Sequence, residues 1–226
     1  MCQFFSGIQT KSGILFDMEQ DSHEHLIKKY KLDDKTREPD FVRLELVPKK
    51  EPWNKDIANW DLTVDQDTLP KWFDEKFAKE DMWNALQLLW KEMLVENVEL
   101  DEIVDRKIRW MVNSKINSLK GTSLVGAMWG SSKVGEMWGS SKVGVMRESS
   151  SVGEMRESSN VGEMRESSKV GAMWESSKVG AMWESSNVGE MWGSSFTVDY
   201  KEGYQRITCA DPTSKIILFK KAKVSK

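Results

Sequence analysis

Hydrophobic and polar positions recur with a period of nine residues over the second half of the chain. From Val125 to Ser195 one unit appears eight times without a change of register: VGAMWGSSK, VGEMWGSSK, VGVMRESSS, VGEMRESSN, VGEMRESSK, VGAMWESSK, VGAMWESSN and VGEMWGSS. Position one is always Val, position two Gly, position four Met, and positions seven and eight are Ser. A degraded copy, INSLKGTSL, occupies residues 116–124. Repetition in fixed register predicts an architecture in which each unit packs on its neighbours.

A period of nine favours a β-solenoid over a helix. Nine residues make two and a half helical turns, so successive Val side chains would fall on opposite helix faces. The Gly and the two Ser in each unit also lower helix propensity, while the constant Val and Met argue against disorder. We therefore predict a two-sided β-solenoid, in which two units form an 18-residue coil with two strands and two turns. A triangular coil built from three units is the alternative.

The variability of each position predicts which way its side chain faces. We expect the invariant positions one, four, seven and eight to face the interior. Positions three, five, six and nine accept charge and should face water. Ser at eight and Val at one are two residues apart, as residues on one face of a strand must be. Gly at two is expected to provide a bend by adopting positive φ, so that Met at four also turns inward.

Stacked coils would align the residues at position five in two external ladders. Coils made of two units would stack at about 4.8 Å, the spacing of neighbouring strands. An Arg above a Trp ring is a cation–π pair worth about 0.5–1 kcal/mol at an exposed site. Lateral Arg–Glu pairs within each unit, such as Arg147–Glu148, should add little. The predicted ladders, which we take as the candidate binding surface, are Trp129, Arg147, Arg165 and Trp183 on one edge and Trp138, Arg156, Trp174 and Trp192 on the other.

The regions before and after the repeat predict two further parts of the chain. Before the repeat, two strands, a helix, two more strands and a long helix indicate a small α+β domain, with a helix packed on an antiparallel sheet. The expected elements are strands at 3–10 and 14–18, a helix at 22–30, strands at 41–47 and 60–65, and a helix from 70 to about 95. After the repeat, strands at 196–200, 204–208 and 215–219 should cap the open end of the solenoid. The predicted boundaries are 1–112, 113–195 and 196–226.

Composition and charge narrow the function classes. The 226 residues carry a net charge of −3, with 18 Lys and Arg against 24 Asp and Glu in residues 1–115. A clustered basic face is missing, so nucleic-acid binding is not expected. No apolar run reaches the length of about 18 residues that a membrane span needs, and the start lacks the features of a secretory signal. Two cysteines form no disulfide framework. We expect a protein of the bacterial cytoplasm, without membrane or cofactor.

Cys2 and His23 are the candidate catalytic residues. Removal of Met1 would expose a cysteine with both a thiol and an α-amine, which together supply a nucleophile and its base. The Met-Cys start followed by a strand resembles the cysteine branch of the N-terminal nucleophile hydrolases. That resemblance implies a small cysteine-dependent hydrolase or transferase, in which His23 or His25 would assist the thiol. The alternative is structural, with Cys2 in a first strand and both histidines at a helix start. The two histidines lie two residues apart and do not share a helix face, so no metal site is expected.

The whole chain resembles a group of uncharacterised phage and prophage proteins. The matching features are residues 1–6, the Ser22-His23 pair, and the Val-Gly-x-Met-Trp/Arg-x-Ser-Ser array. This resemblance implies a phage-type origin and a domain plan but no activity. Because Trp and Arg are enriched at binding hot spots, we expect a non-enzymatic binding or structural protein. Its solenoid would be a scaffold for a protein partner or for self-association. Besides the hydrolase, a solenoid that binds or mimics nucleic acid is an alternative.

Overall fold

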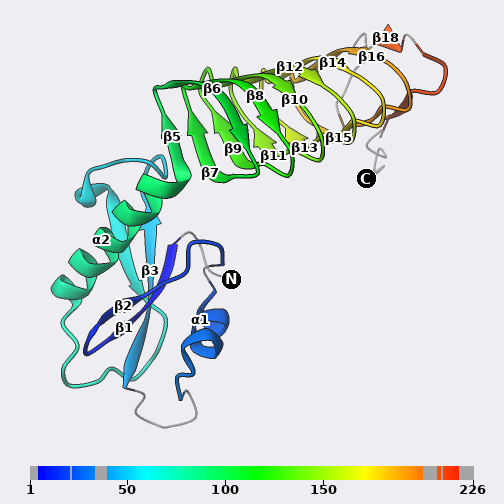
Figure 1. The fold of residues 1–226 in the computed structure, drawn as a ribbon. Helices are drawn as coiled ribbons and strands as arrows, with labels where there is room; N and C mark the ends of the chain where they lie inside the picture. The colour runs from blue at the N-terminus through cyan, green and yellow to red at the C-terminus, as the bar shows by residue number, and fades with distance from the viewer. Residues whose placement is uncertain (1–4, 21, 34–39, 201–207, 210, 219–226) are drawn as a thin grey trace, which may run out of the picture. The chain divides into compact units, whose positions relative to one another are not determined.

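The computed structural model describes residues 5–20, 22–33, 40–200, 208–209 and 211–218. The chain divides into two compact units, Met1–Glu92 and Met93–Lys226. Figure 1 shows a small α+β unit and a long stack of parallel strands. The predicted combination of an α+β domain and a two-sided β-solenoid is therefore confirmed.

The first unit is a four-stranded antiparallel sheet with two helices. The strands pair in the order β2-β1-β3-β4, and the predicted succession of two strands, a helix, two strands and a helix is present. One short 3₁₀ helix, η1, was not predicted. The bounds are β1 Phe5–Thr10, β2 Gly13–Leu15, α1 His23–Tyr30, β3 Phe41–Pro48, η1 Ile57–Asn59, β4 Trp60–Val64 and α2 Glu75–Met93.

Local side-chain chemistry sets where both helices begin. The Ser22 side chain accepts a hydrogen bond from the backbone N–H of His25 and caps α1. The carboxylate of Asp74 accepts from the N–H groups of Lys76 and Phe77, so α2 begins at Glu75 and not at the predicted residue 70. One face of α2 is buried, and its tryptophans pack in the core as expected. The buried residues of α2 are Ala78, Met82, Ala85, Leu86, Leu89 and Trp90.

The second unit consists of two parallel sheets that face each other. One sheet has the order β18-β16-β14-β12-β10-β8-β6 and the other β19-β17-β15-β13-β11-β9-β7-β5. Within the eight copies, each strand pairs with the strand two units later, for example Val134 with Val152. The coil of two units is thus confirmed, and the three-unit alternative is wrong. The bounds are β5 Leu94–Glu96, β6 Glu99–Val104, β7 Lys107–Val112, β8 Lys115–Lys120, β9 Leu124–Trp129, β10 Lys133–Met137, β11 Lys142–Met146, β12 Ser151–Met155, β13 Asn160–Met164, β14 Lys169–Met173, β15 Lys178–Met182, β16 Asn187–Met191, β17 Phe196–Asp199, β18 Thr208–Cys209 and β19 Lys215–Leu218.

The interior of the solenoid is a stack of three residue types. Every Val at position one, every Met at position four and every Ser at position eight in the eight copies is buried, as predicted. Ser at position seven, such as Ser131, is exposed, and the prediction that it faces inward was wrong. Its place in the turn explains the difference: the position-eight N–H bonds to the position-five carbonyl, as Ser132 does with Trp129. Position seven thus lies inside a tight turn that projects outward.

The two glycine positions have different physical reasons. Gly at position two has no positive φ, so its predicted conformational role was wrong. A Cβ on Gly153 would lie 2.5 Å from the carbonyl oxygen of Gly135 in the preceding coil, so the close approach of two backbones requires Gly. The positive φ belongs to position six instead. Gly130 and Gly139 adopt it there at 66° and 71°, and Glu157 adopts it at 57°.

The solenoid begins well before the repeat can be recognised. Its first strand starts at Leu94, whereas the predicted boundary lay at residue 113. The early coils are shorter than two full units. In a coil of two full units, paired residues are 18 positions apart. Val95 and Met111 are two positions closer than that in the sequence, and Ile108 and Val125 are one position closer. The coil length varies in this region, and Ile and Leu replace the Val and Met of the repeat at the buried positions. For both reasons the nine-residue period cannot be recognised in the sequence there.

The strands after the repeat extend both sheets, as expected of a cap. β17 pairs with β15 and β19, and β18 pairs with β16. Residues 204–207 of the predicted second strand lie outside the described residues. Thr197 and Asp199 align with Val179 and Met182 and are buried, so the apolar filling changes to polar side chains here.

Candidate functional site

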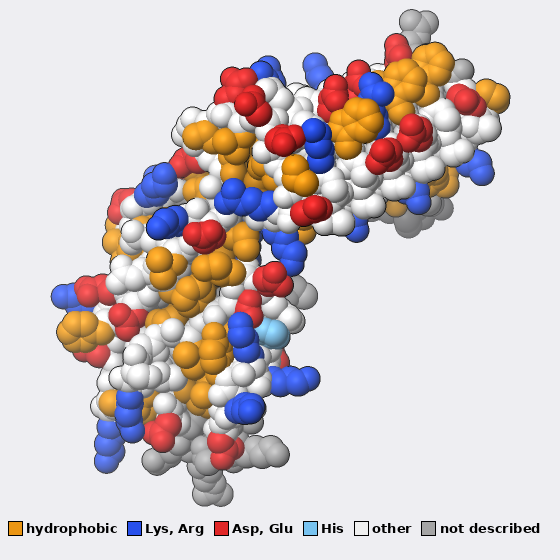
Figure 2. All heavy atoms as spheres, viewed as in Figure 1, with side chains coloured by type: hydrophobic (Ala, Val, Ile, Leu, Met, Phe, Trp, Pro, Cys, Tyr) orange, Lys and Arg blue, Asp and Glu red, His pale blue; other side chains and the backbone are white. Residues whose placement is uncertain are grey.

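The residues at position five form two external ladders with the predicted membership. In the first ladder the Arg147 guanidinium lies 4.7 Å from the centre of the Trp129 ring. Farther along the same edge, Trp183 stacks on Tyr200 with ring centres 4.5 Å apart. Figure 2 shows hydrophobic side chains beside acidic and basic ones along the visible face of the solenoid. We call the predicted set, Trp129, Arg147, Arg165 and Trp183, ladder A; Tyr200, which was not predicted, extends it.

The second ladder has more continuous ring contacts. The Arg156 guanidinium lies between two rings, 4.8 Å from the centre of Trp138 and 5.8 Å from that of Trp174. Trp174 then stacks on Trp192 with centres 5.2 Å apart and planes 8° apart. The predicted cation–π contacts are therefore present in ladder B and between Arg147 and Trp129 of ladder A. We call this set, Trp138, Arg156, Trp174 and Trp192, ladder B.

Acidic side chains at position three orient the ladders. Arg156 donates to the Glu154 carboxylate from both Nε and Nη2, at 3.0 and 2.5 Å. The Trp138 indole N–H donates to Glu136 at 2.7 Å. The prediction paired each Arg with the next residue, but Arg156 pairs with the Glu two residues before it. Side chains two residues apart on a strand lie on the same face, as Glu154 and Arg156 do. The residue at position six already belongs to the turn, so its side chain does not lie on that face.

The ladder geometry limits what this surface can bind. In ladder B both faces of Trp174 are covered, one by Arg156 and the other by Trp192, whereas Trp138 and Trp192 each have one face covered by these neighbours. Flat stacking of a nucleobase or sugar ring, which uses an open aromatic face, is therefore disfavoured at Trp174. Three ladder B side chains are partly buried, and each donates a hydrogen bond to the Glu at position three of its own unit: Trp138, Arg156 and Trp192. A row of fixed aromatic edges with guanidinium and carboxylate groups is suited to protein surfaces.

The structure places His23 in the core of the first unit and leaves Cys2 outside the described residues. His23 is 2% exposed. Its Nε2 lies 3.0 Å from the backbone oxygen of Leu44, and its Nδ1 lies 3.2 Å from Oδ2 of Asp65. Both ring nitrogens thus have hydrogen-bonding neighbours. The catalytic pairing of Cys2 with His23 stays a prediction.

His25 belongs to a different cluster on the same helix. Its Nε2 lies 3.1 Å from Oδ2 of Asp17, and Lys29 donates to the same oxygen at 2.6 Å. The hydrogen bond from Lys29, helped by backbone N–H donors and His25, lowers the pKa of the Asp17 carboxyl far below its usual value. This cluster joins the loop after β2 to α1.

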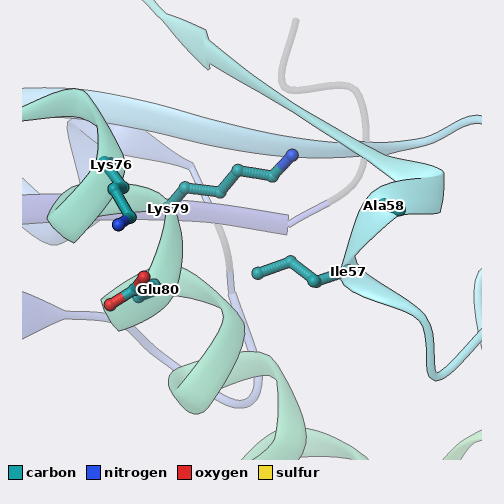
Figure 3. Close-up of a pocket in the computed structure, with 5 residues that line it drawn as sticks. All are labelled: Ile57, Ala58, Lys76, Lys79 and Glu80. Atoms are coloured by element: carbon teal, nitrogen blue, oxygen red, sulfur yellow. The ribbon is translucent and has the colours of Figure 1, made fainter.

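A shallow pocket lies on the first unit. It has a volume of about 170 Å³ and lies between η1 and the beginning of α2 (Figure 3). Its lining residues are Ile57, Ala58, Lys76, Lys79 and Glu80. Small-molecule sites usually enclose about 300–1,000 Å³, so this hollow is too small and open to bury such a ligand.

Comparisons with protein-family models, with curated proteins and with solved structures found no match to this chain. Among the described residues, no helix is both long enough and apolar enough to cross a membrane.

Sequence reasoning missed two sets of residues. The position-three glutamates were assigned only to the solvent face, although two-residue spacing to position five could have suggested their pairing. Glu45 and Asp65 lie near His23 but carry no local signal, because Glu45 is in β3 and Asp65 follows β4, far from His23 in the sequence.

Proposed function

We propose that the protein is a non-enzymatic scaffold whose solenoid binds a protein partner through ladder B. The observation that carries the proposal is the continuous contact of Trp138, Arg156, Trp174 and Trp192, which orders four large side chains on one edge. Trp and Arg contribute most of the energy at many protein interfaces. Because these side chains are already held in place, binding would cost less conformational entropy than it does for free side chains.

The surroundings of ladder B support a protein partner over a nucleic acid. Glu136, Glu154 and Glu190 lie beside the ladder and would repel phosphate groups. The covered faces of Trp174 leave no open stacking platform at the middle of the ladder, of the kind that single strands use. The phage-type origin inferred from the sequence accords with an assembly role and remains part of this proposal.

A double substitution in ladder B tests the proposal. In Trp138→Glu/Trp174→Glu the two new carboxylates flank Arg156, so the stack keeps a charge pair while it loses its aromatic edges. The full-length wild type and the variant are compared by affinity capture from the source cells, followed by binding measurements with the recovered partner. We expect at least a tenfold loss of affinity, since a hot-spot residue contributes about 2 kcal/mol or more.

The matched control is Lys133→Gln/Lys169→Gln. Both lysines are exposed on strands β10 and β14, which also precede the substituted tryptophans, and the change in net charge is the same. The control should keep its partner, and both variants should keep the wild-type circular dichroism spectrum. If the tryptophan variant retains every partner at wild-type affinity, the proposal is wrong.

A further inference from the structure

Three chemically suited side chains converge in the first unit, on the sheet face that α1 covers. His23 begins α1, Glu45 lies in β3, and Asp65 directly follows β4. One nitrogen or oxygen atom from each residue lies within 4.8 Å of the corresponding atoms of the other two. His23 and Glu45 are 2% and 7% exposed, while the Asp65 side chain is 63% exposed. The cluster therefore has a buried side and an opening to solvent.

The hydrogen bonding of His23 fixes which ring nitrogen faces the carboxylates. A backbone carbonyl can only accept, so Nε2 carries a proton and donates it to Leu44. Nδ1 then points at Asp65, whose carboxylate also only accepts when ionised. A neutral imidazole in this tautomer would set two lone pairs against each other. Either a second proton on the ring or a cation between the groups resolves this conflict.

Two features favour a cation. Metal-binding histidines commonly donate their other N–H to a backbone carbonyl, which is the contact that Nε2 makes with Leu44. Zinc ligands at about 2.0–2.1 Å in a tetrahedron lie about 3.3 Å apart, close to the 3.2 Å between His23 Nδ1 and Asp65 Oδ2. Asp65 is at the end of its strand and exposed, so its carboxylate can adjust to an ion.

The Ser6 hydroxyl is a fourth polar group beside this cluster. Ser6 lies directly opposite Glu45 in the β1–β3 register, so the two side chains share a sheet face. Ser6 is fully buried, and its hydroxyl has no hydrogen-bond partner among the described residues. A buried hydroxyl normally finds a partner, and a metal-bound carboxylate or water at this site would provide one.

We propose that His23 Nδ1, Glu45 and Asp65 bind one divalent metal ion of the zinc class, with Ser6 supporting the site. The imidazole nitrogen favours Zn²⁺, and the two carboxylates are ligands that Mn²⁺ also accepts. The sequence could not indicate this set, and it differs from the pair of His23 and His25 that helix geometry argues against.

Metal titration of the full-length, chelator-treated protein tests the site. Zn²⁺ is added while ¹⁵N-labelled histidine side chains are observed by NMR, because the chain has only two histidines and His25 serves as the internal reference. We expect saturable binding of one equivalent, a large change at His23 Nδ1, and an Nε2 that stays protonated. Mn²⁺ is used in parallel by calorimetry, since it binds thiols weakly and so reports on the oxygen and nitrogen ligands.

Two carboxylate variants separate this site from general surface binding. Asp65→Asn should weaken Mn²⁺ and Zn²⁺ binding at least tenfold. Asp61→Asn should leave it unchanged, because Asp61 lies on the same strand with a side chain 62% exposed and pairs with Lys49. An imidazole that is protonated on both nitrogens and does not respond to either metal would overturn the proposal. So would binding that Asp65→Asn leaves intact.

Discussion

Replacing the glycine at position two should separate neighbouring coils, and Gly162→Ala tests this in the middle of the stack. An added Cβ would lie 2.5 Å from the carbonyl oxygen of Gly144 in the preceding coil, whereas ordinary van der Waals contact begins at 3.4 Å. A shift that restores ordinary contact would stretch the adjacent hydrogen bonds, such as Arg165 N–H to Met146 O at 2.9 Å, beyond the usual range.

The expected cost follows from these contacts. Loss of about two backbone hydrogen bonds and the local overpacking together amount to about 2–4 kcal/mol. The free energy of unfolding is measured on the full chain by urea titration with far-ultraviolet circular dichroism. The control is Ser167→Ala, which alters an exposed side chain in the same repeat unit and should change stability by less than about 0.5 kcal/mol. If Gly162→Ala unfolds at the wild-type urea concentration, close backbone approach is not the reason for this glycine.

Two further predictions concern position six and the Asp17 cluster. Glu157→Gly should stabilise the solenoid by about 0.5–1 kcal/mol in the same urea titration, because Gly adopts positive φ more easily; Gly139→Glu, one coil earlier, should do the opposite. Asp17→Asn should lower the midpoint of thermal unfolding by about 2–4 °C at pH 7. The Lys29 hydrogen bond lowers the pKa of the Asp17 carboxyl in the folded protein. The ionised carboxylate therefore contributes fully to the free energy of unfolding above about pH 4, and this contribution is lost as the pH falls toward the folded-state pKa. The variant and the wild type should converge in stability at that low pH. A constant difference between the two proteins down to pH 2 would contradict this assignment.

The repeat made the solenoid predictable because each position samples the same environment eight times. The invariant Val and Met are buried, and the variable side chains at positions three and five lie on the outside, most of them half-buried. Invariance failed as a guide for Ser at position seven, which is constant but exposed in the turn. It also could not tell why a residue is Gly: position two needs room for a neighbouring backbone, and position six needs positive φ.

Coil length explains the missed start of the solenoid. A period can be recognised only while the spacing is constant, and the spacing between paired strands reaches two full units only after the first, shorter coils. The buried positions continue through that region as Val95, Ile103, Ile108 and Ile116. The interior environment is thus preserved where the sequence pattern is not.

The cluster around His23 shows why a site on a sheet face escapes sequence reasoning. Its residues come from β1, α1, β3 and the end of β4, and their proximity follows from the strand order β2-β1-β3-β4. Only when β1 and β3 are known to be neighbours does Ser6 lie opposite Glu45. His23 could be named in advance only as a possible partner of the Cys2 thiol, and not as a ligand. The residues around His23 are Ser6, Glu45 and Asp65, and they span positions 6 to 65 of the sequence. Only the topology of the sheet brings them together.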